Sequence, residues 1–279
     1  MPELPEVETI RRDLEKEVVG KRIKHVEVTG VRAVRRHASA EEFAAPLRGR
    51  RITGVDRRGK YILVRLEGDD VLVVHLGMSG QLLRARSSRE RLERHTHVVV
   101  TFTQGGQLRY VDPRTFGELF VATADEVEHE VPDLAHLGPD PIEEMISWDR
   151  LSQLLHARRS RLKGLLMDQR FLAGIGNLYA DEILWGAGLR YDRRSETLSS
   201  QEVRRLARSI VETLQEAIKH RGSSLADEQY RDLYGEVGDF QSQHQVYGRE
   251  GQPCRRCRST IVRIRTQGRS TFMCERCQV

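Results

Sequence analysis

Several residue types are scarce in this sequence, and each shortage excludes a class of protein. Only four of the 279 residues are cysteines and none precedes position 254, so disulfides cannot hold most of the chain together. No stretch approaches the roughly 18 uninterrupted apolar residues that a membrane span needs. The first residues are acids and prolines, whereas a secretory signal has basic residues followed by an apolar run. We therefore expect a cytoplasmic protein with no membrane partner, long enough for two domains.

Positive charge is concentrated near the end of the chain. The net charge is only +5, from 46 basic and 41 acidic residues, and lysines are scarce, six against forty arginines. Residues 249–279 hold eight arginines against Glu250 and Glu275, a net +6 that leaves the rest near −1. Such an asymmetry is typical of a surface that binds phosphates. A solvated basic tail is the alternative, and charge alone does not separate the two. The arginines are Arg249, Arg255, Arg256, Arg258, Arg263, Arg265, Arg269 and Arg276.

The four cysteines form two CxxC pairs separated by sixteen residues, at Cys254, Cys257, Cys274 and Cys277. Four thiolates in two close pairs suit a tetrahedral structural zinc site, and disulfides are disfavoured in a chain without a secretion signal. A redox pair or an iron centre is the alternative. We predict one structural Zn²⁺.

Hydrophobic periodicity divides the rest of the chain. Residues 5–18 have a helical pattern with Pro5 tolerated in the first turn, and residues 1–4 are expected to precede that helix as a free arm. Residues 21–122 contain short runs rich in Val, Ile, Leu and Tyr, separated by turn signals, which indicate an antiparallel sandwich or a flattened barrel. The runs are KRIKHVEV, RRITGV, KYILVRL, VLVVHLG, HVVVTF, QLRYVD and GELFVA.

The second half is predicted to be helical. Residues 123–147 are acidic and proline-bearing, as expected of a linker. Helical patterns follow from 148 to 155, from 162, and over 200–219, where Ser199 and Glu202 form a candidate capping box. Residues 222–248 are rich in Gly, Ser, Asp and Gln and predict a long loop, either ordered or mobile; loops of this length are usually functional or disordered.

Several motifs occur in order along the chain. The opening MPELPEVETIRRDLE is followed by GKYILV (59–64), HLGMSG (75–80), DPRTFG (112–117), LLMDQ with GIGNLYADEIL (165–184), FQSQHQVYGREG (240–251) and GRST (268–271) within the cysteine segment. With these motifs the chain strongly resembles the formamidopyrimidine-DNA glycosylase family over nearly its whole length.

The resemblance implies an α+β multidomain fold and a function. The fold has an N-terminal antiparallel β-sandwich with an N-terminal helix (1–122), a linker (123–147), a helical helix-two-turn-helix domain with a lesion loop (148–248) and a zinc finger (249–279). The function is base-excision repair: a monomeric enzyme, cytoplasmic and associated with the nucleoid through DNA, binds damaged double-stranded DNA. It removes oxidised purines (8-oxoguanine and formamidopyrimidines) and, as an AP lyase, cuts the strand by β,δ-elimination.

Pro2 is the nucleophile that the resemblance implies. An α-amine has a pKa of about 7.7 to 8.0, so roughly a tenth or more is neutral at pH 7, whereas a lysine near 10.4 is almost wholly protonated. Because a prolyl amine is secondary, its attack on C1′ gives a cationic iminium that acidifies the C2′ protons. Met1 must be removed first, since otherwise the Pro2 nitrogen is an amide. The alternative is a proline that merely stiffens the terminus.

Three further residues have catalytic roles by resemblance. Glu3 exchanges protons with the deoxyribose ring oxygen, although an acid here also suits the helix dipole. Lys60, after Arg58 and Gly59, matches a hairpin lysine that contacts phosphate and assists elimination; a solvated strand-end lysine is the alternative. Arg269 matches the finger arginine that binds phosphates flanking the lesion, against a plain surface charge.

The remaining candidates are DNA contacts. A glycosylase must swing its target base out of the duplex, so other groups must fill the gap. The resemblance assigns this wedge to Met78, Arg114 and Phe116, with Arg114 reading the estranged base, whereas core packing is the default for a lone Met or Phe. Four other residues match positions that contact the DNA backbone, although each alone reads as an ordinary surface or capping residue. They are His95, Arg159, Lys163 and Asn177.

Two alternative functions stay open at this point. A sister branch acting on oxidised pyrimidines usually starts Pro-Glu-Gly-Pro-Glu, and Leu4 favours the purine branch instead. A non-catalytic DNA-binding zinc protein would form no covalent intermediate and would not need the Pro2 and Glu3 arm.

Overall fold

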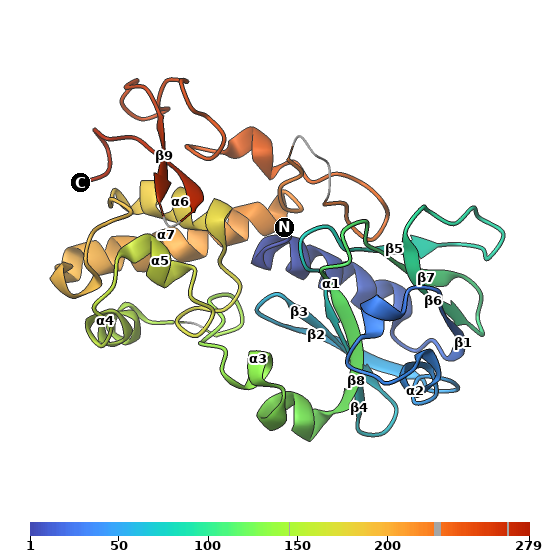
Figure 1. The fold of residues 1–279 in the computed structure, drawn as a ribbon. Helices are drawn as coiled ribbons and strands as arrows, with labels where there is room; N and C mark the ends of the chain where they lie inside the picture. Colours follow the sequence, from blue (N-terminus) through green and yellow to red (C-terminus); the bar gives the residue numbers. More distant parts are fainter. Residues whose placement is uncertain (145, 226–229, 267) are drawn as a thin grey trace. The chain divides into compact units, whose positions relative to one another are not determined.

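The computed structural model describes residues 1–144, 146–225, 230–266 and 268–279 (Figure 1). The chain divides into two compact units. The first comprises Met1–His136 together with His220–Asp239, and the second comprises Leu137–Lys219 together with Phe240–Val279. The described residues of the segment 220–239, which are 220–225 and 230–239, thus belong to the first unit, although the domain prediction grouped them with the helices.

The first unit begins with helix α1 (Leu4–Val18), which confirms the predicted helix. Its apolar face is fully buried at Val7, Ile10 and Leu14. The expectation of a free arm over residues 1–4 was wrong, because Pro2 and Glu3 are buried and the helix already begins at Leu4.

Two four-stranded antiparallel sheets confirm the predicted sandwich. One sheet has the order β1-β6-β7-β5 and the other β2-β3-β4-β8. Side chains of both sheets and of α1 share one hydrophobic core. The strands are β1 (Ile23–Val28), β2 (Ile52–Arg58), β3 (Tyr61–Leu66), β4 (Asp70–His75), β5 (Gln81–Ala85), β6 (Thr96–Phe102), β7 (Gln107–Val111) and β8 (Glu118–Thr123).

Several short elements of this unit lack a strong sequence pattern. Strand β5 is an edge strand that pairs only with β7 among the described strands, so its formation depends on its neighbour more than on its own composition. Short helical turns also interrupt the loops and the predicted linker, where the local sequence has no long apolar period. They are η1 (Val31–Val34), α2 (Ala40–Ala44), η2 (Glu126–Glu130) and α3 (Pro132–Ala135).

The second unit contains α4 (Trp148–His156), α5 (Leu162–Leu166), α6 (Asn177–Ala187), η3 (Ser195–Thr197) and α7 (Ser200–Lys219). The three predicted helical segments and the capping box are confirmed: Glu202 N donates to Ser199 Oγ at 3.3 Å, and Ser199 N donates to the Glu202 carboxylate at 2.8 Å. Helix α6 was not predicted from periodicity. It is buried on nearly every side, so it lacks the polar face that would give an amphipathic period.

The unit ends with η4 (Phe240–Gln243) and a hairpin of β9 (Val262–Thr266) and β10 (Arg269–Met273). The four cysteines flank this hairpin, two on each side. Within the described ranges, no helix combines the length and the hydropathy needed to cross a bilayer.

Candidate functional site

The start of α1 is tied to a distant segment by Glu6. This carboxylate is 2% exposed and accepts hydrogen bonds from Glu3 N at 2.8 Å and from Ser223 N at 2.8 Å. Gly222 has a φ of +78°, and a Cβ there would lie 2.7 Å from Glu6 Oε1. Glu6 therefore holds both the N-terminal arm and the turn at Gly222, which explains why this segment belongs to the first unit.

A second set of contacts fixes the rest of this segment. Arg221 forms ion pairs with Asp13 of α1 and with Asp232, the latter at 2.6 Å. Tyr230 and Leu233 are buried in the core of the first unit. The predicted loop over 222–248 is therefore held by specific contacts at 222–225 and 230–239, while its residues 226–229 lie outside the described part of the chain.

Pro2 and Glu3 lie side by side at this helix start. Glu3 is 5% exposed, whereas Met1 is 53% exposed. With Met1 attached, the Pro2 nitrogen is an amide, so the amine proposed as nucleophile exists only after Met1 is removed. The catalytic roles of both residues remain predictions.

Lys60 occupies the turn between β2 and β3, beside Gly59 at a φ of +56°. It is only 8% exposed, not a freely solvated strand-end lysine. The turn is anchored by Arg57, which pairs with Glu8 of α1 at 3.0 Å and donates to Gly59 O at 2.9 Å. Burial lowers the pKa of His75 to about 4, and the positive charge of Lys60 adds to this lowering. The Lys60 turn is thus fixed to the helix that carries the N-terminal arm.

Met78 and Phe116 are exposed on neighbouring turns. Their exposed fractions are 37% and 46%, which argues against the core-packing alternative. The Arg114 guanidinium lies 4.9 Å from the centre of the Phe116 ring. The turns touch closely at Gly77, where a Cβ would lie 2.5 Å from Gly117 N. Two large apolar side chains and a cation are therefore presented together, as an inserting wedge requires.

Asp112 organises both turns, and sequence reasoning did not assign it a role. It is fully buried and accepts four hydrogen bonds: Oδ1 from Ser79 Oγ (2.6 Å) and Arg114 N (3.2 Å), and Oδ2 from Gly117 N (2.9 Å) and Tyr110 Oη (3.1 Å). Burial alone would raise the pKa of Asp112, but these hydrogen bonds outweigh it and hold the pKa below its usual value. The sequence signal for this role was an acidic residue that follows an apolar strand and precedes a proline.

Strained backbone marks the same end of the sheet. His95 has a φ of +65° and Thr115 a φ of +53°, both rare for residues other than glycine. His95 is exposed, and its carbonyl accepts from Asp112 N at 3.1 Å. Such strain persists only where neighbouring structure imposes it, and it is enriched at functional sites.

In the second unit, Lys163 is committed to protein contacts. Its Nζ lies 2.7 Å from Asp181 Oδ1 and donates to Ser270 O at 3.0 Å and to Thr271 Oγ1 at 2.8 Å. Lys163 is 4% exposed, so it is not an ordinary surface residue. Burial raises the pKa of Asp181 to about 7 despite the opposing effect of Lys163. The pair joins α5 and α6 to strand β10.

Asn177 joins the same cluster and Arg269 lies beside it. Asn177 Nδ2 also donates to Ser270 O, at 3.2 Å, while its buried Oδ1 has no hydrogen-bond partner among the described residues. Arg269 is exposed at the first position of β10, next to Ser270. Arg159 is exposed just after α4. The structure thus groups Lys163, Asn177 and Arg269, and it places Arg159 in the same unit without a contact to that group among those described.

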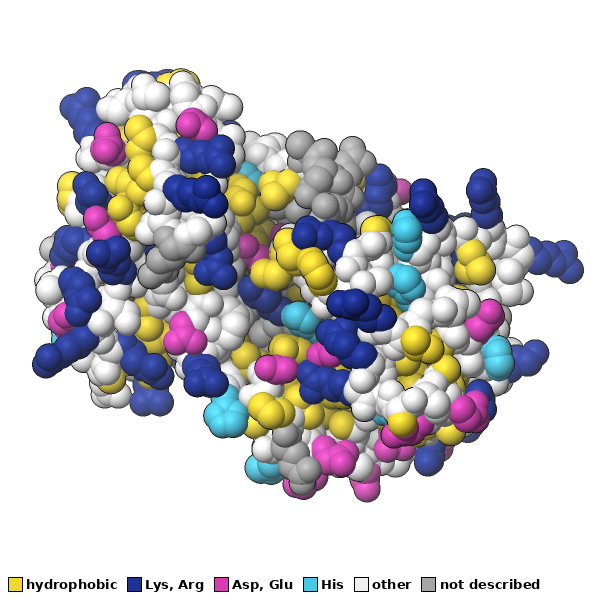
Figure 2. Space-filling view, in the orientation of Figure 1, with side chains coloured by type: hydrophobic (Ala, Val, Ile, Leu, Met, Phe, Trp, Pro, Cys, Tyr) yellow, Lys and Arg dark blue, Asp and Glu magenta, His cyan; other side chains and the backbone are white. Residues whose placement is uncertain are grey.

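The four cysteine sulfurs form one cluster. All four Sγ atoms lie within 4.8 Å of one another, with Cys254 and Cys277 at 3.9 Å and Cys257 and Cys274 at 3.4 Å, and none is in a disulfide. A tetrahedral Zn²⁺ with Zn–S bonds of about 2.3 Å places its sulfurs about 3.8 Å apart. The geometry fits a zinc ion. Lys and Arg side chains cover much of the visible face of this unit (Figure 2).

Known proteins match this chain over its whole length. Residues 1–119 match the formamidopyrimidine-DNA glycosylase N-terminal domain, residues 137–229 the formamidopyrimidine-DNA glycosylase H2TH domain, and residues 251–279 a zinc finger found in FPG and IleRS. Together with the cysteine geometry, the last match shows that the finger binds one structural Zn²⁺.

Full-length relatives and solved structures indicate the same family. The chain is 45% identical to the formamidopyrimidine-DNA glycosylase of Heliobacterium modesticaldum and 42% identical to that of Desulfitobacterium hafniense, each covering 100% of both chains. It is similar to the MutM (FPG) protein of Thermus thermophilus, with a TM-score of 0.88, 40% identity and coverage of 99% and 98%.

It is also similar to wild-type Lactococcus lactis Fpg (MutM) in a complex with DNA containing N7-benzyl-Fapy-dG, with a TM-score of 0.90, 37% identity and coverage of 99% of each chain. Fold, motifs and full-length similarity agree, and this chain belongs to the formamidopyrimidine-DNA glycosylase family.

Proposed function

We propose that this chain removes oxidised purines from damaged double-stranded DNA and then cuts the strand as an AP lyase. We propose further that it acts as a monomer, in the cytoplasm on the nucleoid. The observation that carries the proposal is that Pro2 and Glu3 directly precede α1, in a chain that matches the family from end to end.

Pro2 and Glu3 perform the proposed chemistry. After Met1 is removed, the Pro2 amine attacks C1′ of the extruded nucleotide, a C–N bond forms, and the glycosidic bond breaks as the base leaves. The C1′–O4′ bond then breaks as Glu3 donates a proton to the ring oxygen, and this ring opening leaves a cationic iminium between Pro2 and C1′. Glu3 later accepts a proton. The cationic iminium then favours loss of a C2′ proton and departure of the 3′ phosphate. A second elimination releases the 5′ phosphate.

Other residues position the DNA. Met78 and Phe116 fill the space left by the base, Arg114 reads the estranged partner, and the buried Lys60 assists elimination at a phosphate. His95, Arg159, Asn177 and Arg269 are proposed to act at the DNA backbone. Lys163, whose Nζ is held by Asp181, Ser270 and Thr271, is proposed to act there by positioning this part of the site. The Zn²⁺ holds the β9–β10 hairpin folded and thereby positions Arg269. Phosphate contacts of this kind supply affinity that falls as salt rises.

Borohydride trapping tests the proposal. Protein from which Met1 has been removed is incubated with an 8-oxoguanine duplex and borohydride, and a reduced covalent adduct is expected. The matched control carries an uncleaved N-terminal extension, which keeps every side chain but converts the Pro2 nitrogen into an amide. It should bind the duplex and give no adduct.

Two results would contradict the proposal. An adduct that persists in the extended protein would move the nucleophile away from Pro2. Tight lesion binding without any adduct in the processed protein would favour the non-catalytic zinc protein. A parallel duplex with an oxidised pyrimidine distinguishes the two family branches, and faster excision from the purine duplex is expected.

A further inference from the structure

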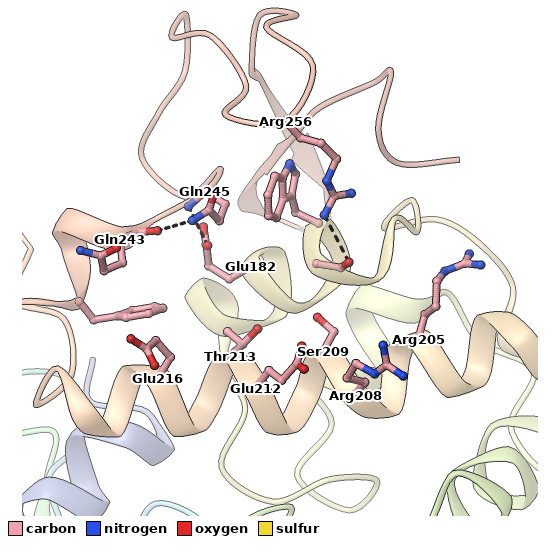
Figure 3. Close-up of a pocket in the computed structure, with 13 residues that line it drawn as sticks. Glu182, Arg205, Arg208, Ser209, Glu212, Thr213, Glu216, Gln243, Gln245 and Arg256 are labelled. Carbon is pink, nitrogen blue, oxygen red and sulfur yellow. Dashed lines mark hydrogen bonds between the residues drawn. The ribbon is translucent and has the colours of Figure 1, made fainter.

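A charged groove lies in the second unit between α6, α7 and the segment that leads to the zinc finger (Figure 3). Its volume is about 480 Å³, within the range of ligand pockets. It shares no residue with the Lys163, Asn177 and Arg269 cluster. Its charged lining residues are Glu182, Arg205, Arg208, Glu212, Glu216 and Arg256.

The walls of the groove are held firmly. Glu182 is buried, and its carboxylate accepts three backbone hydrogen bonds, from residues 245, 246 and 247, at 2.8 to 2.9 Å. Ser209 Oγ of α7 donates to Ile183 O of α6 at 2.7 Å. A Cβ on Gly186 would lie 2.3 Å from that Oγ, so it is glycine at this position that lets the two helices pack this closely. The groove is therefore preformed.

Positive charge collects at one end. Arg205 Nε donates to Ala187 O at 3.0 Å, and the Arg256 guanidinium lies 4.1 Å from the centre of the Trp185 ring. Arg208 is exposed on the same face of α7 as Arg205. Within the described ranges, none of these three arginines forms an ion pair with a carboxylate. Their remaining donors are therefore available to an acidic ligand.

Negative charge follows along the same helix. Glu212 and Glu216 continue the face of Arg205 and Arg208 at helical spacing, so the groove changes sign along α7 (Figure 3). A nucleic-acid strand carries phosphates at every step and would be repelled by the glutamate end. A peptide can carry both signs, and arginine binds carboxylates with two parallel hydrogen bonds.

We propose that this groove binds a segment of a partner protein in which a block of acidic residues is adjacent to a basic one. The acidic residues of the partner segment lie at Arg205, Arg208 and Arg256, and its basic residues lie at Glu212, because Glu216 already forms an ion pair with Lys219 at 3.2 Å. Since the groove and the Arg269 cluster share no residue, we expect this peptide and damaged DNA to bind without competing.

Fluorescence polarisation tests the proposal with the full-length, zinc-loaded protein. The probe is a fluorescein-labelled peptide with a block of glutamates followed by a block of lysines. Saturable binding is expected, and the double variant Arg205→Glu with Arg208→Glu should weaken it at least about tenfold, because like charges then face the glutamates. The matched control is Arg204→Glu, a charge reversal on the same helix at a residue that lies over Trp148 at 4.1 Å instead of in the groove.

Further variants distinguish peptide binding in the groove from unfolding of the protein and from nucleic-acid binding. Glu212→Lys should strengthen binding of an all-glutamate peptide, which a merely unfolded variant would not do. The proposal is overturned if the mixed peptide does not bind, or if Arg204→Glu weakens binding as much as the double variant. It is also overturned if the double variant weakens damaged-duplex binding as much as Arg269→Ala, because the groove would then belong to the nucleic-acid interface.

Discussion

Replacing Asp112 with asparagine should separate the two turns that carry Met78 and Phe116. The carboxylate accepts from four donors, two at each oxygen. An asparagine keeps one acceptor oxygen and replaces the other with an NH₂ group. If the remaining oxygen faces Ser79 and Arg114, the new NH₂ opposes the Gly117 and Tyr110 donors.

The size of the effect follows from these contacts. Two hydrogen bonds to a buried charged acceptor are lost, each contributing about 1.5 to 3 kcal/mol, so we expect the free energy of unfolding to fall by about 3 to 6 kcal/mol. Chemical denaturation of the full-length protein measures this loss. The matched control is Ser79→Ala, which removes only one of the four donors and should therefore cost less, about 1.5 to 3 kcal/mol.

The same variant tests how the wedge works. Base excision requires unstacking, whereas an abasic site has no base to extrude. Asp112→Asn should therefore slow 8-oxoguanine excision about tenfold or more while slowing cleavage of a preformed abasic site much less. Equal loss of both activities, or a stability change under about 1 kcal/mol, would refute the view that Asp112 organises the wedge turns.

Three further predictions concern the second unit. Lys163→Met should destabilise the protein by about 3 to 5 kcal/mol in chemical denaturation, because it leaves Asp181 buried without its partner. Its control, Arg269→Ala, should leave the stability unchanged. This control should instead reduce the slope of log DNA affinity against log salt concentration by about one. Removing zinc with a chelator should abolish duplex binding, seen by polarisation, without changing chemical labelling of the freed Pro2 amine. Burial lowers the pKa of His244 to about 4 from 6.5, so the unfolded state takes up a proton first as pH falls. His244 by itself should thus contribute a loss of about 3 kcal/mol between pH 6.5 and 4, and the His244→Gln variant should lose that much less stability over this range.

Much of this architecture was predictable because the signals are local. The apolar period of α1 and α7, the alternation of the strands and the Ser199 capping box each depend on residues within a few positions. The cysteine spacing likewise predicts a four-sulfur site before any fold is known. The motifs extended these local signals to a family and to named catalytic residues.

The remaining features depend on contacts between residues far apart in the sequence. Glu6 with Ser223 and Asp112 with Ser79 are pairs whose partners no local pattern indicates. Helix α6 is buried on nearly all sides and therefore has no amphipathic period to detect.

The sequence by itself therefore determined the type of most long elements, the zinc site and the family, because periodicity, spacing and motifs are properties of the chain. Only the tertiary structure decided that Pro2 is buried, that Lys163 is held by Asp181, and that the wedge turns share one buried carboxylate. Burial and charge pairing arise when distant segments pack together, so no single stretch of sequence determines them.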